Sequence, residues 1–287
     1  MPVVAVVNQK GGVGKTTVAL GLASAAAAAS QRVLVVDLDP QANATSGMAV
    51  WDPLTTVDRA LESDADGVLA EVVRPAGWPD EILPCMPDVA PSSPLLAGRE
   101  PQLANDPIGA QDRLAMAMKG LEHQYDAVII DCPPSLGLLT VNGLFAARYA
   151  LVVTEPAAWA SDGVEQVLRT ISRVSQRRGG ALATGGIVIN RLGRTRDASF
   201  WYSDLVKTYP QLVLPPIRLR TAVAEAAAQA IPIHGVNRSG AAEAAREFER
   251  VLQHLPDVFP AGAAGAGPFA SPEPVSSGPL PSVPARE

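Results

Sequence analysis

The chain has 287 residues, of which 47% are hydrophobic and 5% aromatic, and a net charge of −6. This length fits one large α/β domain or two small ones, with a core built mainly from Val, Ile, Leu and Ala. No uncharged run of 18 apolar residues predicts a membrane span, and no secretory signal precedes the first strand-like run. Cys85 and Cys132 lie far apart and are expected to be reduced, buried thiols of a cytoplasmic protein.

Apolar runs alternate with segments of helical spacing along most of the chain. Strands are predicted at 3–8, 32–39, 125–134, 150–156, 185–190 and 212–217. Helices are predicted near 16–30, 57–71, 109–123, 136–147, 161–178, 199–208, 221–229 and 239–255. Because the strand runs are apolar on both faces, the sequence predicts an α/β fold with a doubly wound, mostly parallel sheet and helices on both faces.

Two stretches depart from this alternation. The segment 74–107 is rich in Pro, Asp and Gly, and is expected to be an irregular connection with one short strand near 81–86. After Pro260 the chain consists mostly of Pro, Ala, Gly and Ser, which is typical of disorder. The expected organisation is therefore one domain over 1–258 followed by a disordered tail over 259–287.

The stretch QKGGVGKTT, residues 9–17, lies between the first predicted strand and the first predicted helix. Gly11, Gly12 and Gly14 would let backbone N–H groups turn toward phosphate oxygens, and the following helix adds the positive end of its dipole. Lys15 would neutralise β- and γ-phosphates, and the Thr16 hydroxyl could ligate Mg²⁺. A plain strand-to-helix turn does not explain Lys-Thr-Thr at the helix start. The sequence therefore predicts a nucleotide site, completed by Val13 and Thr17.

The same stretch differs from the pattern G-x-x-x-x-G-K-[ST], because Gln9 takes the place of the first glycine and Lys10 follows it. Residues 10–17, K-G-G-V-G-K-T-T, resemble the deviant Walker A box of the ParA/MinD family of P-loop ATPases, in particular its small ParA-type partition members. The resemblance to the family continues through residues 33–47 and 125–144, and returns at 152–168 and 222–233. The resemblance implies ATP and Mg²⁺ as ligands, and a sandwich dimer in which Lys10 reaches the partner's phosphates. A solvated loop charge is the alternative for Lys10.

Acidic and amide side chains end several predicted strands. Asp37 and Asp39 share one strand face, and Asp131 closes the run AVIID, so that all three are expected at the carboxyl edge of the sheet. The resemblance implies that Asp39 positions the attacking water and contributes to the metal site, and that Asp131 holds Mg²⁺ through a water. Asp37 would support Asp39 or the metal, or be structural. Asn190 resembles the family's adenine-reading asparagine, with a turn-forming Asn as the alternative, and the loop around Pro216 would flank the base.

Positive charge is concentrated in one region. From Gln166 to Arg196 there are seven arginines and no acidic residue, and Arg169, Arg173 and Arg177 recur every four residues along one helix face. A solvated face is the alternative for any one of them. Taken together they predict a sequence-independent DNA contact. The candidates are Arg173, Arg177, Arg191, Arg194, Arg196, Arg218 and Arg220.

The resemblance implies an ATP-dependent DNA-partitioning ATPase. Such a protein forms an ATP-bound homodimer, binds nonspecific DNA on the nucleoid, and is stimulated by a ParB-type partner. The alternatives are a related ATPase that positions a protein cargo, such as a carboxysome or a chemoreceptor cluster, and a metabolic P-loop ligase or synthetase. No membrane partner is expected, because the last helical segment, 239–255, mixes Glu and Arg. No iron–sulfur cluster is expected either, because Cys132 directly follows Asp131.

Overall fold

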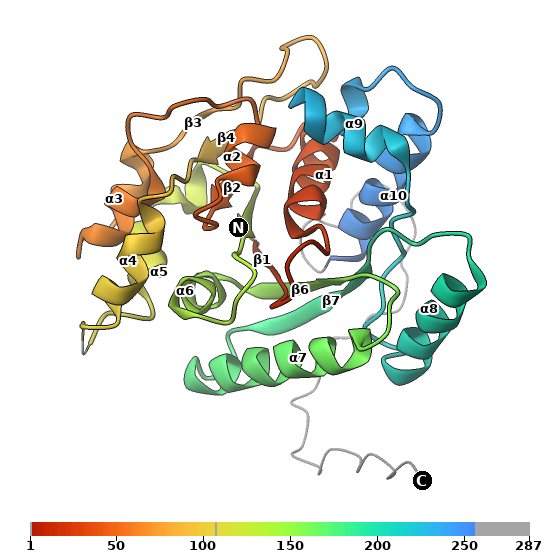
Figure 1. Cartoon of the computed structure of the whole chain (residues 1–287). Coiled ribbons are helices and arrows are strands. Elements are labelled where there is room, and N and C mark those ends of the chain that lie inside the picture. Colours follow the sequence, from red (N-terminus) through yellow and green to blue (C-terminus); the bar gives the residue numbers. More distant parts are fainter. Residues whose placement is uncertain (1, 107, 256–287) are drawn as a thin grey trace, which may run out of the picture.

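The computed structural model describes residues 2–106 and 108–255. Within them, one seven-stranded sheet has the order β3-β4-β2-β5-β1-β6-β7 (Figure 1). Its strands are β1 (Val3–Val7), β2 (Val33–Asp37), β3 (Arg74–Pro75), β4 (Asp88–Ala90), β5 (Ala127–Asp131), β6 (Tyr149–Thr154) and β7 (Ala183–Ile189). All neighbours are parallel except the short edge strand β3, which is antiparallel to β4. The predicted tail, 259–287, lies outside the described residues.

Helices cover both faces of the sheet, and the predicted doubly wound α/β fold is confirmed. One face carries α1 (Lys15–Ala28), α2 (Asn43–Gly47), α9 (Thr221–Gln229) and α10 (Ala241–His254). The other carries α3 (Val57–Glu62), α4 (Leu96–Leu103), α5 (Arg113–Ala117), α6 (Leu138–Ala146), α7 (Ala160–Arg177) and α8 (Arg196–Thr208). Single turns of 3₁₀ helix occur at η1 (Val68–Glu71), η2 (Leu121–His123) and η3 (Ile233–Gly235).

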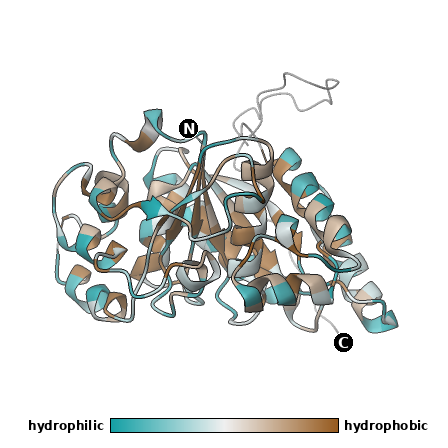
Figure 2. Ribbon diagram, turned by 90° about the horizontal axis from the view of Figure 1, so that it is seen from above, coloured by the Kyte–Doolittle hydropathy of each residue, from teal (hydrophilic) through white to brown (hydrophobic). Residues whose placement is uncertain are grey.

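The sheet is buried on both sides because its strands alternate between two cores. Val33 and Val35 of β2 pack on the α1 side, whereas Leu34 and Val36 pack on the α6 side. Every residue of β1, β2, β5 and β6 is buried. Figure 2 shows the hydrophobic strands between two layers of helices whose outer faces are hydrophilic. This is the pattern expected when helical crossovers cover both faces of a parallel sheet.

The predicted strand at 212–217 is wrong. This segment runs beside β7 and makes only isolated bridges, Ile187 with Val213 and Leu192 with Arg218. Pro215 and Pro216 stand between these bridges. Because proline has no N–H to donate, the pair interrupts any ladder with β7.

The segment 74–107 is more regular than predicted. No strand forms at 81–86; instead β3 and β4 flank this stretch, and α4 follows. Pro84 interrupts the predicted strand. Helix α4 was not predicted because it contains Pro101, and proline is unfavourable inside a helix. Two predicted helices, 57–71 and 109–123, are each divided into an α-helix and a 3₁₀ turn. The breaks fall before Gly67 and Gly120, which adopt φ values of 77° and 87°.

Candidate nucleotide site

The loop between β1 and α1 lies at the carboxyl edge of the sheet. Gly12 and Gly14 have φ values of 81° and 87°, in the region that L side chains rarely adopt. At Gly14 space is also lacking, since a Cβ there would lie 2.2 Å from Nδ2 of Asn190. Gly14 therefore permits both the loop conformation and the close approach of β7. Parallel α/β sheets bind ligands at this edge, where β1 is followed by a helix N-terminus.

Lys15 is a buried cation without a protein partner. The residue is 6% exposed, and none of the described residues forms a hydrogen bond or ion pair with its ammonium. Burial lowers the pKa of Lys15, and the charges of Asp131 and Asp39 act in the opposite direction. Because burying a charge is costly unless it is paired, this arrangement calls for an anion in the loop. A phosphate chain fits that requirement.

Thr16 and Asp131 form the candidate metal centre. The Thr16 hydroxyl donates a 2.7 Å hydrogen bond to Oδ2 of Asp131, and Oδ1 of Asp131 is buried without a partner among the described residues. Burial, together with the charge of Asp37, raises the pKa of Asp131 well above its usual range. A buried carboxylate with an unsatisfied oxygen beside a hydroxyl fits Mg²⁺, which prefers oxygen ligands. When bound, Mg²⁺ would add positive charge at the phosphates.

Asp37 and Asp39 have different surroundings. Asp37 lies opposite Asp131 in the β2–β5 register and is fully buried. Its carboxylate accepts hydrogen bonds from the amide of Asp39 (3.0 Å) and from the amide and hydroxyl of Thr45 (2.8 and 2.7 Å). Burial raises the pKa of Asp37 to about 6, against the opposing effect of these bonds. Asp37 thus holds the turn that leads into α2, which agrees with the alternative that this residue is structural.

Asp39 lies within this turn and is 7% exposed. Its Oδ1 accepts a 2.9 Å hydrogen bond from the amide of Gln41, and its carbonyl accepts one of 2.8 Å from the hydroxyl of Ser92. These contacts fix the segment that bears the carboxylate. The structure therefore brings Lys15, Thr16, Asp39 and Asp131 to one edge of the sheet.

Lys10 is exposed and pairs with an acidic residue outside the loop. Its side chain is 57% exposed, and its ammonium forms a 3.0 Å ion pair with Glu155, which directly follows β6. The neighbouring Gln9 donates a 2.7 Å hydrogen bond to Gln166 of α7. The front of the loop is thus tied to the β6–α7 segment, and Lys10 is not one of the cations around its own phosphate position.

Asn190 follows β7 and is 1% exposed. Its Nδ2 donates a 2.9 Å hydrogen bond to the carbonyl of Val13 in the loop. The amide of Ile217 donates to the carbonyl of Ile189, so Pro216 lies beside the same end of β7. Asn190, which was predicted to read the adenine, and the Pro216 loop, which was predicted to flank it, thus both lie at the end of β7.

Comparisons with known proteins agree with this geometry. A family model described as an AAA domain matches residues 1–183. The sporulation initiation inhibitor protein Soj of Bacillus subtilis is 35% identical over 209 residues, which cover 72% of this chain and 79% of Soj. The chromosome-partitioning ATPase Soj of Thermus thermophilus is 34% identical over 261 residues, which cover 89% of this chain and 97% of the relative.

A solved structure bears on the ligands. Cobyrinic acid a,c-diamide synthase from Mycobacterium smegmatis, with a bound ATP analog and magnesium, matches with a TM-score of 0.69 and 34% identity. The match covers 80% of this chain and 93% of the synthase. The chain belongs to the ParA/MinD family of P-loop ATPases. It is an ATPase that uses ATP and Mg²⁺, and its relatives are the Soj/ParA-type partition proteins.

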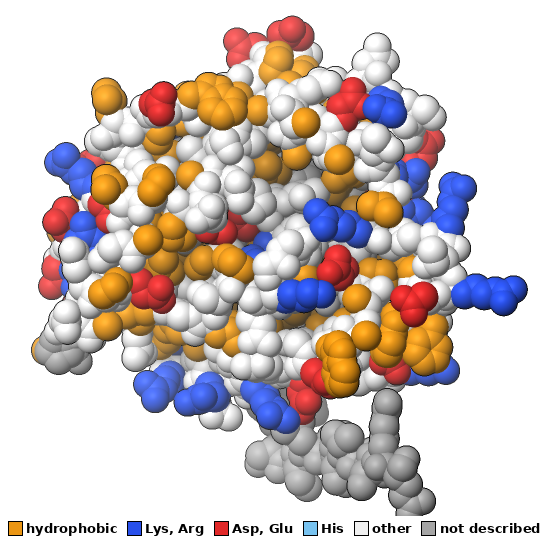
Figure 3. All heavy atoms as spheres, in the orientation of Figure 1, with side chains coloured by type: hydrophobic (Ala, Val, Ile, Leu, Met, Phe, Trp, Pro, Cys, Tyr) orange, Lys and Arg blue, Asp and Glu red, His pale blue; other side chains and the backbone are white. Residues whose placement is uncertain are grey.

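The predicted DNA-contacting arginines of this ParA/MinD-family ATPase fall into two groups. Arg173 and Arg177 on α7, and Arg194 and Arg196 at the start of α8, are exposed and form no hydrogen bond or ion pair with described residues. Figure 3 shows Lys and Arg side chains along the edge over α7. The remaining candidates make internal contacts and are Arg191, Arg218 and Arg220.

Glu247 accounts for two of these internal contacts. It is 2% exposed and accepts hydrogen bonds from the backbone amide of Arg218 (2.9 Å) and the guanidinium of Arg220 (2.7 Å). Arg220 thus neutralises a buried carboxylate of α10, whereas the Arg218 side chain remains 55% exposed. The periodicity and charge of the sequence contained no signal for this pairing, because Glu247 lies 27 residues away.

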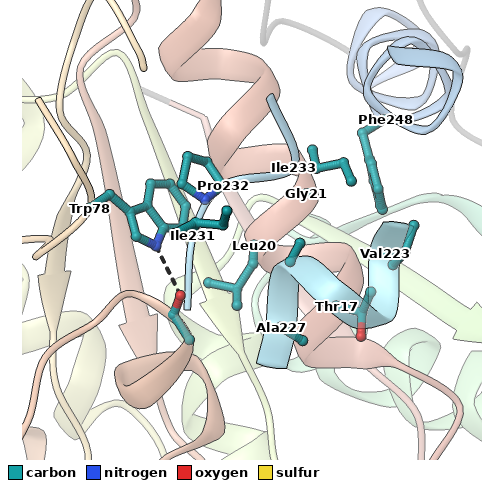
Figure 4. Close-up of a pocket in the computed structure, with 12 residues that line it drawn as sticks. Thr17, Leu20, Gly21, Trp78, Val223, Ala227, Ile231, Pro232, Ile233 and Phe248 are labelled. Atoms are coloured by element: carbon teal, nitrogen blue, oxygen red, sulfur yellow. Dashed lines mark hydrogen bonds between the residues drawn. The ribbon is translucent and has the colours of Figure 1, made fainter. Parts of the chain in front are cut away.

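An apolar pocket lies beside α1 (Figure 4). It is formed by α1, α9, the segment 231–233 and Trp78, whose indole N–H donates a 2.9 Å hydrogen bond to the carbonyl of Gly47. Thr17, a predicted ligand-binding residue, lies at its margin. No cationic side chain is among the residues that line this pocket. No helix in the described part of the chain is long and apolar enough to cross a bilayer.

Sequence reasoning missed several residues of the site. Glu155, Thr45 and Ser92 hold Lys10, Asp37 and the backbone of Asp39, respectively. Glu100 of α4 accepts hydrogen bonds from the first amides of α6, Leu138 and Leu139. Of these four residues, Glu155 had a sequence signal, since an acidic residue closes the strand-like run 150–156. The two cysteines are free, with Cys132 buried as predicted and Cys85 partly exposed.

Proposed function

We propose that this ATPase forms a sandwich dimer with ATP, binds DNA without sequence preference in that state, and is stimulated to hydrolyse ATP by a ParB-type partner. It would act in the cytoplasm, on the nucleoid. The observation that carries the DNA part is the set of exposed, unpaired arginines on α7 and at the start of α8. The similarity to the chromosome-partitioning ATPase Soj supports the same function.

The position of Lys10 supports the dimer. One lysine, Lys15, is already buried beside the phosphate position of its own chain. Lys10 is exposed at the loop entrance and is held by Glu155. In a two-fold dimer built across this edge, each Lys10 would exchange Glu155 for the partner's phosphates, and the contact would be reciprocal. Dimerisation would then depend on the nucleotide, because the phosphates supply the charge that attracts Lys10.

Hydrolysis in this proposal is mainly positioning and charge stabilisation. The loop amides of residues 11–16 and the Lys15 ammonium would hold the phosphates. Thr16 and Asp131 would hold Mg²⁺, and Asp39 would orient the attacking water. Burial of Lys15 and Asp131 excludes bulk water, which strengthens each of these electrostatic contacts.

Unpaired arginines are suited to DNA because their guanidinium groups are free to contact phosphates. Arg194 lies on the loop that follows β7, and Arg196 is the first residue of α8. The same loop contacts the nucleotide site through Asn190 and Arg191. Arg173 and Arg177 are exposed on α7 and extend the positive surface along that helix. Contacts of this kind read the backbone rather than the bases, and so they predict affinity without sequence preference and with strong salt dependence.

Fluorescence anisotropy with two unrelated DNA duplexes tests this proposal. With a non-hydrolysable ATP analogue and Mg²⁺, the protein should bind both duplexes equally, and a double Arg194→Ala, Arg196→Ala variant should bind both more weakly with a smaller salt slope. Arg59→Ala is the matched control, since Arg59 is exposed and unpaired among described residues but lies on α3, far from α8 in Figure 1. Equal affinity of the double variant and wild type would exclude these arginines as the contact.

Two other functions use the same ATPase chemistry. The match to cobyrinic acid a,c-diamide synthase favours a metabolic P-loop synthetase as the second candidate. A ParA-type ATPase that positions a protein cargo is a variant of the first. The anisotropy measurement separates the synthetase from both, because nucleotide-dependent DNA binding is expected only of the partition and positioning functions. A ParB-type protein that accelerates ATP turnover would then identify DNA as the cargo.

A further inference from the structure

Two consecutive carbonyl groups of the phosphate loop point toward the end of β7. The carbonyl of Val13 accepts a 2.9 Å hydrogen bond from Nδ2 of Asn190. The carbonyl of Gly12 accepts one of 2.6 Å from a terminal guanidinium nitrogen of Arg191. A loop that presents its N–H groups to phosphates has to direct carbonyl groups elsewhere, and each of these needs a donor. Asn190 and Arg191 supply the two donors.

The backbone of Arg191 is held on both sides. The amide of Asn190 donates a 2.7 Å hydrogen bond to the carbonyl of Thr154, and the amide of Leu192 donates one of 3.0 Å to the carbonyl of Ile217. Between these anchors Arg191 adopts a φ of 54°, in the left-handed region that residues other than glycine rarely occupy. The anchors and the side-chain bond to Gly12 together keep an arginine in this conformation.

We infer that Arg191 is a positioning residue of the nucleotide site and not a DNA contact. Its guanidinium holds the Gly12 carbonyl outward, so that the following loop amides stay directed at the phosphates. Arg194 and Arg196 lie three and five residues further along the chain and form no hydrogen bond with the described residues. In this proposal, residues of the nucleotide site and residues of the DNA surface therefore follow each other within a few positions after β7. This inference rests on the nucleotide site proposed above.

The test is the affinity for a fluorescent ADP derivative with Mg²⁺, measured without DNA. Arg191→Met keeps an apolar stem but removes the donor, and Arg191→Gly removes the side chain while favouring the observed φ. Both variants should bind about tenfold more weakly, the usual effect of losing one hydrogen bond from a charged donor. Arg191→Lys should recover affinity to within about threefold of wild type, because the ammonium can still donate to Gly12. Arg194→Met is the matched control and should bind ADP as wild type does.

The outcomes are distinct. If the Arg191→Met and Arg191→Gly proteins bind ADP normally but bind DNA weakly, Arg191 is a DNA contact and the inference is wrong. Weak ADP binding by Arg191→Lys equal to that of Arg191→Met would exclude the hydrogen bond as the cause. The thermal unfolding midpoint of the nucleotide-free variants should match wild type, and a fall in parallel with ADP affinity would indicate a merely structural role. If Lys15→Gln also binds ADP normally, the nucleotide site itself is wrong, which is a separate failure.

Discussion

At the scale of single residues, Lys15 combines a cost in the free protein with a proposed role in binding phosphate. The residue is 6% exposed, its ammonium has no hydrogen-bond or ion-pair partner among the described residues, and burial lowers its pKa. An uncompensated buried charge costs free energy of folding, and an anion that enters the loop recovers that cost as binding energy. Function and stability therefore oppose each other at this position.

Lys15→Met should separate the two effects. We expect the affinity for ATP to fall about a hundredfold or more, which corresponds to about 2.7 kcal/mol, because the phosphates lose their buried cation. The nucleotide-free variant should be as stable as wild type or more stable in urea unfolding. Calorimetric titration with ATP and Mg²⁺ gives the first quantity. A variant that binds ATP like wild type would contradict the placement of phosphates beside Lys15.

Asp39→Asn tests the residue assigned to the attacking water. The asparagine keeps an oxygen that can accept the hydrogen bond from the Gln41 amide, while it removes the carboxylate charge. We expect ATP binding and dimer formation to persist, with turnover reduced about a hundredfold because the water is no longer positioned. Phosphate release and nucleotide affinity are the two measurements. Unchanged turnover would remove Asp39 from the hydrolysis step.

At the scale of elements, α1 connects the phosphate loop to the packing of the whole α1 side. Its residues are mostly small, and Gly21 lies against the ring of Phe248 in α10. A Cβ at Gly21 would lie 2.3 Å from that ring. The close contact holds the helix that begins at Lys15 against the C-terminal helix, and so positions the start of the nucleotide site.

Gly21→Ala should therefore destabilise the protein despite alanine's higher helix propensity. Overpacking against Phe248 should lower the free energy of unfolding by about 1–3 kcal/mol. Gly163→Ala in α7 is the matched control, because nothing lies within 4 Å of its Cβ position; there the same substitution should stabilise by about 0.5–1 kcal/mol. Urea unfolding of both variants measures the difference. An equal effect at the two positions would mean that α1 and α10 are packed less closely than described.

Most elements of the sheet could be predicted from the sequence because the central strands are continuous apolar runs. The errors arose where proline and long-range pairing decide the structure. Pro215 and Pro216 interrupt the pairing of 212–217 with β7, and β4 exists because its three residues pair with β2 across more than 50 positions. Helix α4 contains Pro101, which no local propensity would place in a helix.

The residues of the phosphate loop and the strand-end carboxylates were predictable for a different reason. Their chemistry requires particular residue types at fixed spacing beside a strand and a helix, and Lys15, Thr16 and Asp131 meet that requirement. Contacts such as Arg191 with Gly12, or Arg220 with Glu247, depend on how distant segments fold together. Residue type and charge therefore indicated arginines as a group, but could not separate those held internally from those left free.

At the scale of the whole molecule, exposed groups surround the nucleotide site. Lys10 and Glu155 form an ion pair at the edge of this site. The arginines without partners among the described residues lie on α7 and around the start of α8. The same sheet edge thus carries the phosphate site, and next to it the surface proposed for DNA. An ATP-bound dimer across this edge would join the two arginine surfaces and double the number of phosphate contacts, which explains why DNA affinity should depend on nucleotide.

The molar mass in solution, measured by light scattering, tests this account most directly. Wild type with Mg²⁺ and a non-hydrolysable ATP analogue should have twice the monomer mass, and with ADP it should have the monomer mass. Lys10→Ala should bind the analogue with little loss yet remain a monomer, because its own phosphates are held by Lys15 and the partner's phosphates lose their second lysine. A wild-type mass that does not respond to the analogue, or a Lys10→Ala protein that dimerises like wild type, would contradict it.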